Sequence, residues 1–238
     1  MKPFELLSQA QAPDGTALKL VRRDDEYLIL AGDKPLMSSR MHGSEEALAE
    51  AACRNARTLK RPQVLIGGLG MGFTLRAALG ILPSQTRVVV VELVPAVVEW
   101  NRGPLGALSA YPLNDKRVRV EISDVAATMR LCAGQFDAIL LDVDNGPAAF
   151  TVSNNAALYN DAGIKNAYKA LKRNGMLAIW SGREDKRFER RLCQAGFAVK
   201  VERVSARGKG GGARHTIYLA HKSSAHGMSE GRYHSFER

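Results

Sequence analysis

A glycine-rich segment and a strand-ending carboxylate carry the first chemical signal in this chain. Residues 64–72 read Val-Leu-Ile-Gly-Gly-Leu-Gly-Met-Gly, and the apolar run 88–91 ends in Glu92. Glycine permits a sharp turn that lets a ligand approach the backbone. A carboxylate at the end of the next strand can bind a ribose diol, and capping of the following helix is the alternative. The pattern predicts a nucleoside-cofactor site. Its first candidate residues are Gly67, Gly68, Gly70 and Glu92.

Three further carboxylates follow segments that are expected to form strands. Asp124 comes after the expected strand 117–122, where it can read an adenine amino group or, alternatively, cap the next helix. Asp142 and Asp144 end a nearly continuous apolar strand that begins at Phe136. Acids beside the reactive end of a cofactor can accept a proton from an amine or hold a cationic substrate. The alternative is that they cap the Asn-Gly-Pro turn that follows.

A parallel sheet is needed to bring these residues together. Apolar runs alternating with helical patterns predict a Rossmann-like α/β fold with seven strands. The link 206–213 is too short for a crossover helix, so the last two strands are expected to be antiparallel neighbours. This reversed last strand, and glycine spacing unlike G-x-G-x-x-G, favour an S-adenosylmethionine-type site over a nicotinamide site. The strands are expected at about 63–67, 87–93, 117–122, 136–142, 175–181, 197–204 and 214–221.

Outside this sheet, the sequence predicts two smaller elements. Alternating segments at 17–21 and 27–31 flank a polar turn and indicate a β-hairpin. Ser44 is expected to cap a helix that runs to about Leu59, with acids in its first turn. The predicted units are an N-terminal β-hairpin element at 1–43, a catalytic domain at 44–222 and a flexible tail at 223–238.

Composition limits the class of protein. The formal charge is +10, but the basic residues are spread along the chain, which favours a solvated basic surface over a nucleic-acid site without excluding the latter. No apolar run is long enough to span a membrane, so a cytoplasmic location is expected. Cys53, Cys132 and Cys193 lie far apart within apolar helical patterns. We interpret them as buried thiols and expect neither disulfides nor a metal site.

The order and spacing of these motifs resemble those of the spermidine synthase (polyamine aminopropyltransferase) family, a branch of the class I S-adenosylmethionine-dependent methyltransferase fold. The resemblance covers roughly 19–222, although the family usually has an aspartate where this chain has Gly70. It implies that the glutamate after the second strand holds the ribose, that an acid after the third reads adenine and that the first acid after the fourth deprotonates the attacking amine. The motifs that carry it are 67–72, 91–98, 116–120 with Asp124, 136–144, 158–159 and 171–175.

By this resemblance, Glu92, Asp124 and Asp142 take the ribose, adenine and base roles. Leu93 and Val125 complete the cofactor site, to which Asp142 is also assigned. Four side chains are expected on the substrate side. They are Asp144, Tyr159, Trp180 and His42. Core packing is the alternative for Trp180, and an ordinary loop position is the alternative for His42.

The predicted function is transfer of an aminopropyl group from decarboxylated S-adenosylmethionine to a polyamine such as putrescine, as part of polyamine biosynthesis. A homodimer or other homo-oligomer is expected from the resemblance. One alternative is a methyltransferase that uses S-adenosylmethionine, because the absence of an acid at Gly70 leaves room for the donor's carboxylate. The other is a nucleoside-binding protein without catalysis.

Overall fold

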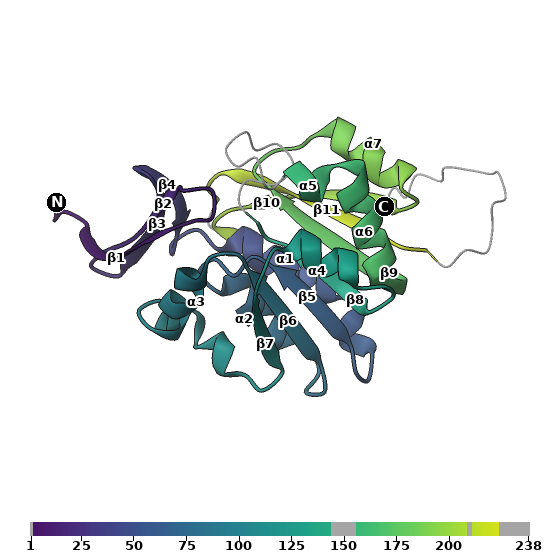
Figure 1. The fold of residues 1–238 in the computed structure, drawn as a ribbon, viewed down its shortest axis with the longest axis horizontal. Helices are drawn as coiled ribbons and strands as arrows, with labels where there is room; N and C mark the ends of the chain where they lie inside the picture. The colour runs from purple at the N-terminus through teal and green to yellow at the C-terminus, as the bar shows by residue number, and fades with distance from the viewer. Residues whose placement is uncertain (1, 144–155, 209–210, 224–238) are drawn as a thin grey trace.

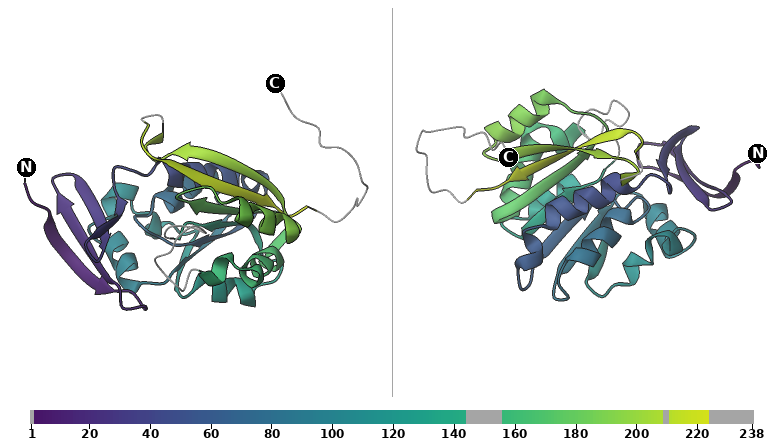
Figure 2. Two further views of the ribbon diagram at one scale, coloured as in Figure 1. Left: turned by 90° about the horizontal axis from the view of Figure 1, so that it is seen from above. Right: turned by 180° about the vertical axis from the view of Figure 1, so that it is seen from behind.

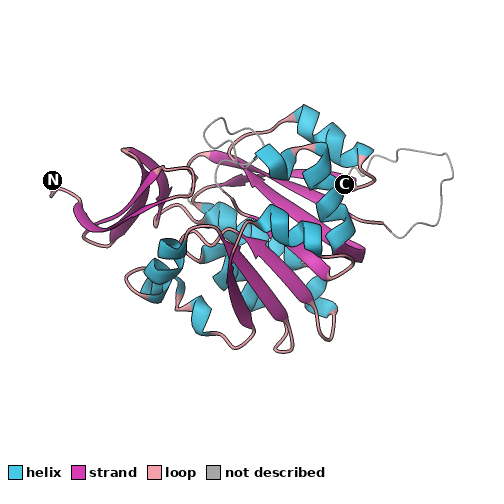
Figure 3. Cartoon of the chain, viewed as in Figure 1, coloured by secondary structure: helices cyan, strands magenta, loops and turns pink. Residues whose placement is uncertain are grey.

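The computed structural model describes residues 2–143, 156–208 and 211–223, and it contains two β-sheets (Figures 1 and 3). The smaller sheet comprises β1 Glu5–Gln11, β2 Ala17–Arg23, β3 Glu26–Ala31 and β4 Lys34–Ser38. The larger sheet comprises β5 Gln63–Gly67, β6 Arg87–Glu92, β7 Val118–Ile122, β8 Phe136–Leu141, β9 Leu171–Ser181, β10 Ala198–Ser205 and β11 Arg214–His221.

Seven α-helices and three short 3₁₀-helices connect these strands in the described part of the chain. The α-helices are α1 Gly43–Cys53, α2 Phe73–Ile81, α3 Pro95–Arg102, α4 Val125–Leu131, α5 Ala156–Tyr159, α6 Asp161–Ala170 and α7 Lys186–Gln194. The 3₁₀-helices are Ala56–Thr58, Gly106–Ser109 and Pro112–Asn114. None of these described helices has the length and apolarity required to cross a membrane.

The larger sheet has the predicted topology. Its strand order is β10-β11-β9-β8-β5-β6-β7, and the strands from β9 to β7 are parallel. Strand β11 runs antiparallel to both β9 and β10, because the link from β10 is too short to return the chain to the opposite edge. The prediction of a Rossmann-like sheet with a reversed last strand is therefore confirmed.

Helices cover both faces of the larger sheet, as Figure 2 shows. Val64 and Ile66 of β5 face the core formed with α1, α2 and α3, whereas Leu65 between them faces the core formed with α4, α6 and α7. A strand buried on both faces must be apolar along its whole length, which explains the continuous apolar run before the glycines. The two cores thus lie on opposite faces of the larger sheet.

The N-terminal β element is larger than the sequence indicated. Strands β2 and β3 form the predicted hairpin, but β1 and β4 extend it to an antiparallel sheet in the order β1-β2-β3-β4. Strand β1 is mostly exposed, and β4 is short and at most partly buried, so neither shows the apolar alternation that identifies a strand from sequence. Backbone pairing with the hairpin holds them in place. The sheet lies at one end of the molecule (Figures 1 and 2).

Helix α1 begins and ends differently from the prediction. His42 occupies the N-cap position without a side-chain capping bond, and the helix ends at Cys53 rather than near Leu59. Ser44 is fully buried inside the first turn, where its hydroxyl contacts Glu45 and His215. The Ser44 hydroxyl, which the sequence pattern assigned to helix capping, therefore makes a tertiary contact with His215 instead.

The three cysteines differ in burial. Cys53 is buried and Cys132 is partly buried, but Cys193 is exposed, so the prediction of three buried thiols is wrong. Helix α7 buries Phe188 and Leu192, which lie four residues apart on one face. Cys193 is rotated away from that face by its position in the helix.

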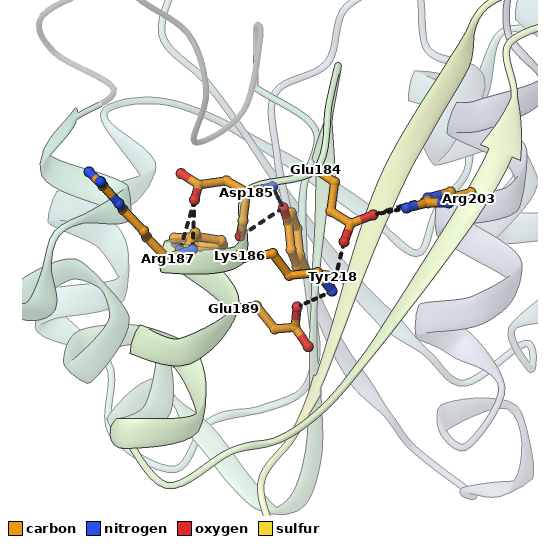
Figure 4. Close-up of polar contacts among 8 residues, drawn as sticks. Glu184, Asp185, Lys186, Arg187, Glu189, Arg203 and Tyr218 are labelled. Atoms are coloured by element: carbon orange, nitrogen blue, oxygen red, sulfur yellow. Dashed lines mark hydrogen bonds and ion pairs between the residues drawn. The ribbon is translucent and has the colours of Figure 1, made fainter.

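Polar contacts fix the connection from β9 to α7 (Figure 4). Asp185 caps α7 by accepting hydrogen bonds from the backbone N–H groups of Arg187 and Phe188 at 2.8 and 3.2 Å. Glu184 forms ion pairs with Lys186 at 2.7 Å and with Arg203 of β10 at 2.6 Å. These contacts hold the chain that leaves the carboxyl end of β9.

Candidate active site

The carboxyl ends of adjacent parallel strands bring the predicted site residues to one edge of the sheet. The backbone N–H of Asp142, after β8, donates to the carbonyl of Gly67 in β5 at 2.9 Å. The N–H of Gly68 donates in turn to the carbonyl of Val91 in β6, also at 2.9 Å. Parallel pairing thus places the glycine loop between Glu92 on one side and Asp142 on the other, as open α/β sheets place their ligand sites.

The glycine loop has a backbone that other residues would strain. Gly68 has φ +88° and Gly70 has φ +52°, both in the left-handed region. A Cβ atom on Gly68 would overlap the backbone oxygen of Asp142, whereas a Cβ on Gly70 would lie 3.1 Å from Sδ of Met37 in β4. The loop is therefore close-packed against the end of β8, and a thioether covers it at Gly70.

Glu92 ties the glycine loop to the start of α3. Its side chain is only 8% exposed, and its two carboxylate oxygens accept the backbone N–H groups of Leu69 and Val94, each at 2.9 Å. Burial raises the pKa of Glu92, while these backbone hydrogen bonds act in the opposite direction. The carboxylate has a structural role at this edge, and ribose binding by Glu92 stays a prediction.

The predicted adenine side of the site has a polar cap and an apolar surface. Asp124 lies at the N-cap of α4, where its side chain accepts the backbone N–H of Ala126 at 2.8 Å. This contact is helix capping, the alternative to adenine recognition. Val125 is buried against Gly67. Leu93 is 37% exposed and Ile122 is 51% exposed at the ends of two paired strands. Exposed apolar side chains beside a polar group suit a nucleobase, although adenine recognition stays a prediction.

Asp142 is close to a second carboxylate that the sequence motifs did not indicate. The Thr74 hydroxyl of α2 donates to Oδ2 of Asp142, and the Ser44 hydroxyl donates to Oε2 of Glu45 at 2.7 Å. Burial raises the pKa of Asp142 to about 6. Burial also raises the pKa of Glu45 to about 7, and the negative charge of Asp142 adds to that effect.

Helical spacing contains the signal that could have identified Glu45. Leu48 and Ala49 are fully buried and follow Glu45 by three and four residues, so Glu45 shares their face of α1. The capping pattern identifies Glu45 only as an acidic residue in the first turn of the helix, where a negative charge interacts favourably with the helix dipole. An acid on the apolar face of a helix is a stronger indication of a site than an acid in its first turn.

Trp180 is connected to Ser44 of α1 through His215 of β11. Its ring packs edge-on against His215 of β11, with centroids 4.7 Å apart, and His215 Nδ1 lies 2.9 Å from the Ser44 hydroxyl. Burial lowers the pKa of His215. The indole nitrogen of Trp180 is buried and has no hydrogen-bond partner among residues 2–143, 156–208 and 211–223.

The other predicted substrate residues lie in different surroundings. Tyr159 is buried and packs edge-on against Phe188 at 5.7 Å, inside the core beneath α7. His42 stacks on Phe73 at 4.4 Å, next to the start of α2, and its Nδ1 lies 3.1 Å from a Glu46 carboxylate oxygen. Asp144 lies outside the described residues. The described ranges contain no group of three or more His, Cys, Asp or Glu side chains arranged to hold a metal ion.

Comparison with known proteins adds a family match. The family model of the spermine/spermidine synthase domain matches residues 41–195. Polyamine aminopropyltransferase from Mycobacterium tuberculosis is 29% identical over 164 residues, which cover 68% of this chain. The same alignment covers 30% of the relative, so the chain spans less than a third of the length of that curated protein.

Solved structures support the fold assignment. Spermidine synthase from Thermotoga maritima superposes with a TM-score of 0.70 at 19% identity, over 92% of this chain and 72% of that one. A spermidine synthase in complex with the transition-state analogue AdoDATO superposes with a TM-score of 0.73 at 21% identity, over 92% of this chain and 74% of that one. At these identities the similarity shows a shared fold.

Proposed function

Since the chain belongs to the spermine/spermidine synthase domain family, we propose that it transfers an aminopropyl group from decarboxylated S-adenosylmethionine to a polyamine such as putrescine. The observation that carries this proposal is the desolvated carboxyl of Asp142, which lies directly beside the glycine loop. Two similar proteins add support: the M. tuberculosis relative is named a polyamine aminopropyltransferase, and one structural neighbour binds AdoDATO.

In the proposed reaction, Asp142 prepares the nucleophile. A polyamine is protonated near neutral pH, so the attacking nitrogen must first lose a proton. With its pKa at about 6, Asp142 is mostly ionised at pH 7 and can hold the ammonium and then accept its proton. The neutral nitrogen attacks the methylene carbon next to the sulfonium, the carbon–sulfur bond breaks, and 5′-methylthioadenosine leaves. Thr74 orients the carboxylate through its hydrogen bond.

For the donor, we propose that the glycine loop approaches the nucleoside closely and that Glu92 binds its ribose. Asp124 would read the adenine amino group, with Leu93 and Val125 beside the base. The exposure of Leu93 and Ile122 supports this placement of the base. His42, Trp180, Tyr159 and Asp144 stay proposed substrate residues. The proposed units at 1–43, 44–222 and 223–238, the cytoplasmic location and the homo-oligomer also stay predictions.

The decisive experiment separates donor from acceptor. Purified protein is titrated calorimetrically with S-adenosylmethionine and with its decarboxylated form, and products are identified by mass spectrometry after putrescine is added. Preference for the decarboxylated donor together with formation of spermidine is the expected result. Preference for S-adenosylmethionine without an aminopropylated product would favour methyl transfer. Tight nucleoside binding without any turnover would favour a non-catalytic nucleoside-binding protein.

A further inference from the structure

Helix α1 packs against α2 and β8, which brings Glu45 near enough to Asp142 for the negative charge of Asp142 to raise the pKa of Glu45. The helix packs against α2, which carries Thr74, and against β8, whose end carries Asp142. Ser44 fixes one oxygen of Glu45 and is itself in contact with His215 of β11. Glu45 is thus held at the side of α1 that faces the proposed reaction site.

The described residues around this pair of carboxylates do not neutralise it. Among residues 2–143, 156–208 and 211–223, neither Glu45 nor Asp142 forms an ion pair. Arg76 of α2 pairs instead with Glu46, and burial lowers the pKa of His215, which favours its neutral form. Glu46 adds further negative charge near Glu45. Two desolvated acids without a cation partner bind a proton or an external cation strongly.

The opposite wall of this site is apolar at the glycine loop. Gly70 has no side chain, and Met37 lies where one would extend. A thioether offers no charge to an ammonium group. Among the described residues around this site, the carboxylates that could compensate a cationic acceptor are on the side of α1 and β8.

We propose that Glu45 is a second acceptor-binding residue, which holds the protonated amino group together with Asp142 and makes the site selective for cationic acceptors. This inference rests on the proposed function. At about pH 6.5 the two carboxylates share about one proton, which an arriving ammonium displaces into the solvent. The ammonium keeps its own proton at this stage, and Asp142 accepts that proton later, when the nitrogen attacks.

The test measures amine binding and proton release without turnover. Protein saturated with 5′-methylthioadenosine is titrated with putrescine at pH 6.5, in buffers of different ionisation enthalpy, so that the number of protons released can be obtained. The wild-type protein is expected to release up to about one proton at pH 6.5 and almost none at pH 8.5, where both acids are ionised. Glu45→Gln is expected to weaken putrescine binding by about 30-fold or more and to reduce proton release.

Glu50→Gln is the matched control, because Glu50 is exposed on the same helix. It removes the same charge and should retain both putrescine binding and proton release. Affinity for 5′-methylthioadenosine should be unchanged in both variants and shows that each is folded. If Glu45→Gln does not fold, the pH dependence of proton release by the wild-type protein still tests the inference.

Several outcomes would overturn the inference. These are wild-type putrescine affinity in Glu45→Gln, equal proton release at pH 6.5 and 8.5, or nucleoside binding by the wild-type protein without any putrescine binding. Failure of the proposed function has a different signature. In that case putrescine binding depends on Glu45 as expected, but decarboxylated S-adenosylmethionine yields no spermidine.

Discussion

Among single residues, Asp142 combines three features that suit a base. Its backbone is fixed by Gly67, its side chain accepts the Thr74 hydroxyl, and burial raises its pKa to about 6. Such a group is mostly ionised at pH 7 but binds a proton more readily than an exposed aspartate. Because Asp142 lies next to the glycine loop, this proton acceptor is close to the proposed donor site.

Replacing Asp142 by asparagine tests this role. Asp142→Asn keeps the side-chain shape but removes the proton acceptor, so aminopropyl transfer is expected to slow by about 10²- to 10⁴-fold. Affinity for 5′-methylthioadenosine should change little, because the proposed nucleoside contacts lie elsewhere on the edge. Product formation and calorimetric titration measure the two effects. Equal loss of turnover and nucleoside binding would indicate a structural role for Asp142.

Glu92 has a different role from Asp142, because both of its oxygens accept backbone N–H groups. In Glu92→Gln, the amide nitrogen would face one of these donors, and that N–H would lose its partner. We expect a loss of about 1–3 kcal/mol in the free energy of unfolding, together with weaker nucleoside binding. Urea denaturation and calorimetry measure these changes. A variant with wild-type stability would show that the two hydrogen bonds contribute little.

Among the structural elements, the glycine loop and the end of β8 act as one close-packed unit. The positive φ of Gly68 and its contact with the backbone of Asp142 leave no room for a side chain. Asn101 of α3 donates to the carbonyl of Gly70 at 2.8 Å and holds the far side of the loop. The position of the base therefore depends on the conformation of the loop.

A glycine pair tests this dependence. Gly68→Ala is expected to cost about 2 kcal/mol or more of unfolding free energy, because it adds backbone strain and a clash. It should also reduce turnover by displacing Asp142. Gly80→Ala is the control, since Gly80 lies in α2 where an added Cβ would meet no atom of a neighbouring element within 4 Å. That change should stabilise the protein by about 0.5–1 kcal/mol, as measured by denaturant unfolding. Equal effects of both changes would contradict the packing argument.

For the molecule as a whole, the carboxylate pair links stability to pH. Folding raises the pKa of Glu45 from 4.5 to about 7 and that of Asp142 from 3.8 to about 6. The folded protein therefore binds more protons than the unfolded chain between about pH 4 and pH 7. These two groups contribute stability at the acidic end of this window, and that contribution is lost as the pH rises through their folded-state pKa values.

Thermal unfolding of a variant pair can measure this contribution. The melting temperature of Glu45→Gln should rise relative to that of the wild-type protein between pH 5 and pH 8, because glutamine has no charge to desolvate. Each kcal/mol corresponds to about 2–4 °C for a chain of this size. In Glu50→Gln, the difference from the wild-type protein should stay constant. Parallel melting curves for Glu45→Gln and the wild-type protein would show that Glu45 ionises normally in the folded state.

Most of the main sheet, and the line of residues along its edge, could be predicted from the amino-acid sequence. Apolar runs and their spacing located the strands, and the short link before β11 predicted the direction of that strand. These features are local, because strand period, turn chemistry and loop length depend on neighbouring residues. Parallel pairing then requires that Gly68, Glu92 and Asp142 lie at one edge.

What faces these residues depends instead on tertiary packing. The packing of α1 places Glu45 near Asp142, and Ser44 against His215, although each pair is distant in sequence. Strand β4 places Met37 over Gly70 in the same way. A local pattern gives the apolar face of a helix, but the position of that face depends on how the element packs against the others. The charge of the proposed acceptor site is therefore a property of the folded molecule.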